Sequence, residues 1–163
     1  MHIPATRPLT VLMLSALLLG GTVLQARAAD SAPPAAAADP LAAAREQIAA
    51  KHWAAAIEEL QKVNATGSAD WNNLMGYSMR KRKVPDYAAA ERYYAEALRI
   101  DPQHRGTLEY SGELALMKGD LPTAEQRLAA LDKLCTFSCG EYRDLKKAIE
   151  RYKANGNRYA AAD

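Results

Sequence analysis

Cys135 and Cys139 are the two cysteines of the chain, and three residues separate them. Two thiols at this spacing can form a disulfide, exchange with other thiols or bind a soft metal ion. His104 is the residue we would expect to join them as a third metal ligand. The compartment and the fold around the two cysteines decide between these chemistries.

The first residues predict the compartment. Residues 1–28 have the features of a secretory signal peptide, because Arg7 precedes an apolar run at 9–19 and small residues follow at Ala26 and Ala28. We expect cleavage near Ala28 and a periplasmic or secreted protein. The apolar run is much shorter than the roughly 20 residues that span a bilayer as a helix, so no stable membrane span is predicted.

Export favours the disulfide. An oxidising compartment closes isolated thiol pairs, and we expect residues 135–139 to form a turn between two helices. In a turn, the Cα atoms of Cys135 and Cys139 can approach within the ~4.4–6.8 Å that a disulfide requires. We therefore predict a structural disulfide and no resident metal or cofactor. A labile disulfide and a soft-metal site that includes His104 are the alternatives.

Charge and composition divide the rest of the chain. Loss of the signal peptide removes Arg7 and Arg27, so the formal charge of +2 falls to zero. Because nucleic-acid binding depends on a strongly cationic surface, no nucleic-acid partner is expected. Residues 29–40 are rich in Ala and Pro, which is typical of a disordered leader. One domain is expected at 41–156, followed by a frayed tail at 157–163.

Apolar residues of this domain recur at helical spacing, and no alternating pattern of strands is present. The sequence therefore predicts an all-α fold. Positions of matching type also recur 34 residues apart, as at Ala90 and Ala124, which is typical of helix pairs stacked in series. Helices are expected near 41–50, 53–63, 70–82, 86–100, 106–118, 121–134 and 140–154.

Three segments resemble the tetratricopeptide repeat (TPR), a family of paired helices. Residues 71–102 carry its pattern at Gly76, Ala90, Tyr94, Ala97, Asp101 and Pro102. Residues 106–134 carry it at Gly112, Gly119, Asp120, Ala124, Leu128 and Leu131, and residues 41–63 less regularly at Trp53, Ala56, Leu60 and Val63. The resemblance implies a right-handed α-solenoid with helix pairs at about 41–66, 70–102 and 105–134. We expect residues 140–154 to form a helix that caps its open end.

The resemblance also implies a binding surface, since the first helix of each TPR pair lines a concave groove. The implied groove residues are Asn73, Tyr77, Arg80, Glu109, Glu113 and Leu116. The first three follow the spacing i, i+4, i+7 on one helix, and the last three do so on another. Each set of three therefore shares one helix face. Such a mixture of groups suits an extended peptide or protein segment of mixed charge. The alternative is that these side chains only face solvent.

A run of basic residues follows, at Arg80, Lys81, Arg82 and Lys83. One interpretation is a solvated turn between two helices. The other is a weak contact with an anionic surface, either an acidic patch of a partner or lipid headgroups.

Catalytic residues are not predicted. His52 and His104 are expected at opposite edges of the helix stack, and no serine or cysteine is next to a histidine in sequence. Glu109 and Glu113 share a helix face, but acid–base catalysis would require burial and a shifted pKa. We expect a non-enzymatic module that binds a protein or peptide. The alternative is a metal- or thiol-handling protein that uses Cys135 and Cys139.

Overall fold

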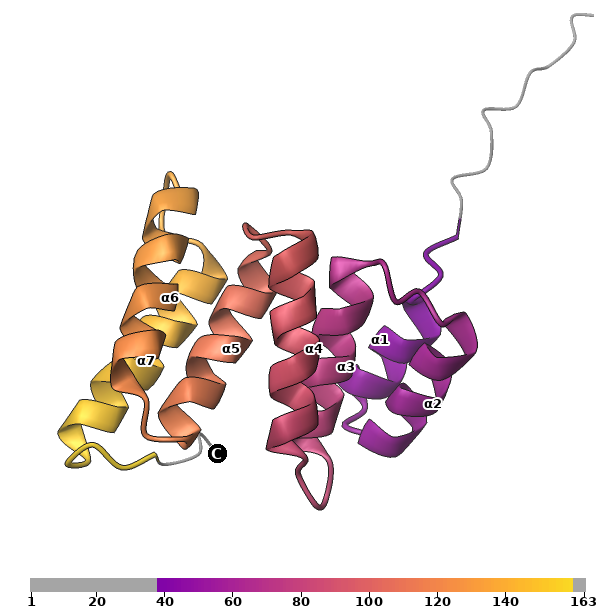
Figure 1. The fold of residues 1–163 in the computed structure, drawn as a ribbon, viewed down its shortest axis with the longest axis horizontal. Helices are drawn as coiled ribbons and strands as arrows, with labels where there is room; N and C mark the ends of the chain where they lie inside the picture. The colour runs from indigo at the N-terminus through magenta and orange to yellow at the C-terminus, as the bar shows by residue number, and fades with distance from the viewer. Residues whose placement is uncertain (1–37, 160–163) are drawn as a thin grey trace, which may run out of the picture. The chain divides into compact units, whose positions relative to one another are not determined.

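A computed structural model describes residues 38–159, and these residues form helices without a strand (Figure 1). The helices are α1 Ala42–Ala49, α2 Trp53–Val63, α3 Ala69–Lys81, α4 Tyr87–Ile100, α5 Arg105–Met117, α6 Leu121–Leu134 and α7 Gly140–Ala154. The predicted all-α class is confirmed, and each expected helix is present with ends that agree to within one residue.

The predicted signal peptide, its cleavage site near Ala28 and most of the expected leader lie outside the described residues. Among residues 38–159, no helix combines the length and the apolar character needed to cross a membrane.

Polar residues fix where several helices begin. The side chains of Ser68, Asp86 and Asp120 accept hydrogen bonds from backbone N–H groups in the first turns of α3, α4 and α6. His104 does the same for α5, because its Nδ1 accepts from the N–H of Thr107 at 3.1 Å. These caps are local in sequence, which explains why the helix starts are predictable.

Consecutive helices pack on one another, and the odd-numbered helices α1, α3, α5 and α7 also contact each other in order. Polar contacts join the first turns of α3, α5 and α7 in order. Further along, Arg80 of α3 meets Glu113 of α5, and Gly119 after α5 lies near Tyr152 of α7, so the three helices run in the same direction. Figure 1 shows them alternating in direction with α4 and α6. Polar residues on α3, α5 and α7 can therefore meet on one side of the helix array.

The C-terminal part of the core is built by α5, α6 and α7. Leu145, Ile149 and Tyr152 of α7 are buried on one face of that helix and pack with residues of α5 and α6, including Leu131. The packing is close at Gly112 of α5, where a Cβ atom would lie 2.7 Å from a methyl group of Leu145. A small residue is therefore required for α5 and α7 to approach this closely.

The segment after α7 differs from the expected frayed tail in its first residues. Asn157 donates its backbone N–H to the carbonyl of Tyr152 at 2.9 Å, and the ring of Tyr159 packs partly buried against the α5–α6–α7 core. Residues 160–163 lie outside the described part of the chain.

Candidate functional site

The first turns of α3 and α5 are joined by a network of neutral and charged groups, which we call the Asn73 network: Asp70, Asn73, His104 and Thr107. The Thr107 hydroxyl donates to Asn73 Oδ1 at 3.1 Å. His104 Nδ1 accepts from the Thr107 backbone, so Nε2 carries the proton and donates to Asp70 Oδ1 at 2.9 Å. Asn73 is 6% exposed, so it is a structural contact and not the partner-facing residue that the sequence predicted.

Two turns further along α3, Arg80 is buried between α3 and α5. The residue is 4% exposed, and its Nη1 donates to Glu113 Oε2 at 2.7 Å. Its Cζ lies 5.5 Å from the ring centres of both Tyr77 and Tyr110, which adds a cation–π attraction. Burial acts against the charge, but the ion pair with the Glu113 carboxylate opposes that effect; the pKa of Arg80 is raised, and the guanidinium stays charged.

Five buried side-chain atoms of residues 38–159 lack a hydrogen-bond partner. They are the hydroxyls of Ser78 and Tyr94 and the Nε atoms of Arg80, Arg127 and Arg151. Burial raises the pKa of the Tyr94 hydroxyl despite the opposing charge of Arg80, so the hydroxyl stays protonated. An unsatisfied buried donor costs on the order of 1–3 kcal/mol, and the Asn73 network carries no such cost.

Glu109 lies one turn before Glu113 on α5 and has a different environment. It is 9% exposed, and within residues 38–159 it makes no hydrogen bond or ion pair. Burial, together with Glu113, Asp144 and Glu141, raises the pKa of Glu109 to about 8, against a smaller opposing effect of Arg80. At neutral pH this carboxyl is therefore mainly protonated in the absence of a ligand.

These groups line an open cavity of about 360 Å³ between α3, α5 and α7, which we call the α3–α5–α7 cavity. Its lining residues are Tyr77, Arg80, Lys81, Glu109, Tyr110, Glu113, Asp144, Lys147 and Arg151. The cavity offers two aromatic rings, an unpartnered carboxyl and several charges to a ligand. Tyr77, Arg80, Glu109 and Glu113 of the predicted groove thus line one cavity, but Arg80 is buried against Glu113.

Leu116 does not belong to this cavity. It is 1% exposed and lies in the core with residues of α6 and α7. The third position of the predicted α5 stripe is covered by the shared core of α5, α6 and α7, so Leu116 has no surface for a partner.

Several cavity residues were missed by the sequence analysis. Tyr110 follows Glu109 directly but was outside the single stripe assigned to α5. Asp144, Lys147 and Arg151 were missed because α7 was considered only as a cap with one apolar face. Their spacing of i, i+3 and i+7 was a usable signal, since it places the three charges on one side of the helix.

The four consecutive basic residues do not form one patch. Arg80 and Lys81 belong to α3, and Arg80 is buried against Glu113, so it is not available for an anionic surface. Arg82 and Lys83 follow the helix and are exposed. They line a separate hollow with Trp53, Ile57 and Val84. A contact with an anionic surface remains a prediction for Lys81, Arg82 and Lys83.

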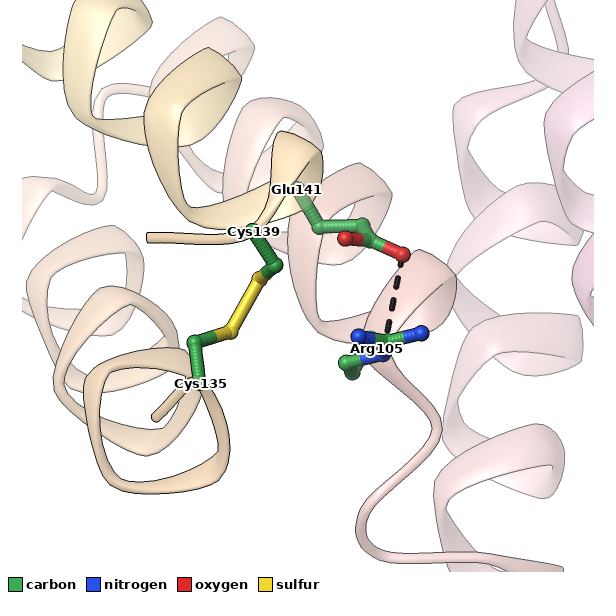
Figure 2. The surroundings of a disulfide bond; sticks show 4 residues. All are labelled: Arg105, Cys135, Cys139 and Glu141. Carbon is green, nitrogen blue, oxygen red and sulfur yellow. Dashed lines mark ion pairs between the residues drawn. A yellow bond between two sulfur atoms is a disulfide. The ribbon is translucent and has the colours of Figure 1, made fainter. Parts of the chain in front are cut away.

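The predicted disulfide is present. Cys135 and Cys139 are bonded, with Cα atoms 5.6 Å apart, and they connect the end of α6 to the start of α7 (Figure 2). Beside them, Arg105 of α5 and Glu141 of α7 form an ion pair of 3.7 Å. The described residues hold no group of three or more His, Cys, Asp or Glu side chains suited to a metal ion. His104, the third ligand of the alternative site, contacts Asp70 and Thr107 instead.

Comparison of the chain with protein-family models, with curated proteins and with solved structures gave no match.

Proposed function

We propose that this protein is an exported, non-catalytic adaptor that binds a segment of a protein partner in the α3–α5–α7 cavity. In this proposal, the helices form a right-handed TPR-like α-solenoid with α7 as its cap. The alternating packing of consecutive helices and the direct contacts among α1, α3, α5 and α7 support this architecture. Localisation in the periplasm or outside the cell rests on the N-terminal sequence and agrees with the disulfide.

The cavity carries the binding proposal, and Glu109 is its most informative residue. Its carboxyl has no partner within residues 38–159 and opens onto the cavity, so a ligand donor or cation can pair with it there. Tyr77 and Tyr110 provide flat, partly exposed aromatic walls next to it. Aromatic residues of this kind contribute strongly to binding because they bury much area at a low entropic cost.

Site-specific photocrosslinking tests this proposal. A photoreactive amino acid is placed at Lys147, an exposed cavity position on α7, and at Gln126, an exposed position on α6 that does not line the cavity. Crosslinking is carried out in cells that export the full chain, and the captured chain and its crosslinked segment are identified by mass spectrometry. The same segment is then synthesised and added to the purified protein.

The proposal predicts one specific crosslinked segment at position 147, none of it at position 126, and competition by the synthetic segment. Equal crosslinking at both positions, or a captured segment that does not bind the purified protein, would reject the cavity as the binding site.

A further inference from the structure

We propose that the α3–α5–α7 cavity is electrostatically polarised along its helices and selects a segment with one basic and one acidic residue about three positions apart. This inference rests on the proposed function, because it specifies the chemistry of the segment that the cavity binds.

The acidic end of the cavity is formed by the earlier turns of α5 and α7. Glu109 and Asp144 line it, and Glu141 adds to the negative field at Glu109 although it pairs with Arg105. Glu109 is almost fully buried, has no partner among the described residues and faces the cavity. An ammonium or guanidinium group placed here would meet two carboxyls and the edge of an aromatic wall.

The basic end is formed by the later turns of α3 and α7. Lys81, Lys147 and Arg151 line it, and none of them forms an ion pair with another described residue. Nε of Arg151 is buried and also lacks a hydrogen-bond partner within residues 38–159. A carboxylate of the ligand would meet the positive charges of Lys81, Lys147 and Arg151.

The middle of the cavity is neutral, because Arg80 and Glu113 pair with each other at 2.7 Å. The negative charge at one end of the cavity and the positive charge at the other therefore remain separate. Asp144 and Arg151 are seven positions apart, which at ~1.5 Å per residue places their levels roughly 10 Å apart along α7. An extended polyproline II segment covers that distance in about three residues, and residues i and i+3 of such a segment project to the same side.

The test uses purified full-length protein and libraries of short peptides with two fixed positions three apart and uncharged residues elsewhere. The fixed pair is Lys–Glu, Lys–Lys, Glu–Glu or Gln–Gln. We expect the Lys–Glu library to yield the tightest binders, about threefold to tenfold tighter than Gln–Gln, since each partly exposed ion pair contributes modestly. The advantage should shrink as salt is added.

A charge reversal provides the decisive variant. Asp144→Lys should weaken Lys–Glu binders and strengthen Glu–Glu binders, a gain that an unfolded protein cannot show. Asp132→Lys is the matched control, because it makes the same change at an exposed position of α6 outside the cavity. Binding that ignores the fixed charges, or equal effects of the two variants, would overturn the polarity while leaving the binding function intact. The absence of any binder, together with no specific crosslinking at position 147, would overturn both.

Discussion

The contact between α3 and α5 has two ends that differ in how completely their polar groups are satisfied. At the first turns, the hydroxyl of Thr107 and the side chains of Asn73 and His104 all have partners within hydrogen-bond distance. Two turns later, Arg80 uses one nitrogen on Glu113 while its Nε has no partner in the described chain.

The difference separates structural from functional polar groups. Polar groups that stabilise a fold are normally paired in the interior, as they are in the Asn73 network. Groups beside a cavity that have no partner among the described residues, such as Glu109, are available to a ligand. The lack of a partner is explained if a ligand pairs with these groups. We therefore place the binding site at the Arg80 end of the contact between α3 and α5.

The largest effect is expected from Arg80→Met. The substitution leaves Glu113 without its buried partner and removes the cation between two tyrosine rings. Because Glu113 is only partly buried, we expect a loss of about 2–4 kcal/mol in the free energy of unfolding, measured by urea denaturation. Arg92→Met, at an exposed position of α4, is the control and should change stability by less than about 0.5 kcal/mol. Similar losses in the two variants would mean that the Arg80 pair is not a buried contact.

Removal of the disulfide tests which end of the contact between α3 and α5 depends on α7. Cys135→Ser opens a short loop, for which the chain-entropy model gives about 2 kcal/mol of lost stability. The helical circular dichroism spectrum should be retained. Hydrogen exchange should increase in α7 and not in the first turns of α3 and α5, because the Asn73 network has no residue on α7. Rapid alkylation of both thiols in untreated wild-type protein would instead favour the labile or metal-binding interpretation.

Thr107→Val probes the satisfied end. The isosteric change removes a buried hydroxyl and leaves Asn73 Oδ1 without its donor, at a cost of about 1–2 kcal/mol in thermal or urea unfolding. Peptide affinity should stay within about twofold of the wild type, because the network does not line the cavity. A large loss of affinity at retained stability would show that this end also contacts the ligand.

Glu109→Gln should have an effect that depends on pH and vanishes in acid. The pKa of Glu109 is raised from 4.5 to about 8, so its contribution to stability is fully present below pH 4.5 and is lost as pH rises to about 8. The neutral variant avoids this loss. After allowance for solvent screening, we expect it to be about 1–2 kcal/mol more stable than wild type above pH 8 and equal to it near pH 4. A pH-independent difference would indicate a packing effect.

The helices and the disulfide could be predicted because their causes are local. Asp86 and Asp120 cap the helices that follow them, and Cys135 and Cys139 lie four positions apart at a helix boundary. The site was predicted only in its centre, at residues such as Tyr77. Asn73 belongs to the same predicted face of α3, but its side chain contacts Thr107 of α5 and does not line the cavity.

The missed part of the site depends on contacts between segments distant in sequence. Leu116 is buried in the core that α5 shares with α6 and α7, and Asp144 and Lys147 enter the site because α7 packs beside α5. Helical periodicity gives the face of each helix but not which neighbour covers it, so these residues could not be assigned from one chain alone.

The most direct test of the incomplete end is the pKa of Glu109 in the unliganded protein, measured by carbon-13 NMR of its side-chain carboxyl across a pH titration. Glu109→Gln identifies the resonance. The structure predicts a midpoint of about 8, shifted to a lower pH when a Lys–Glu peptide is bound. A midpoint near the ordinary glutamate value of about 4.5 would show that Glu109 is solvated or paired, and would contradict the interpretation of the α3–α5–α7 cavity as an unfinished binding site.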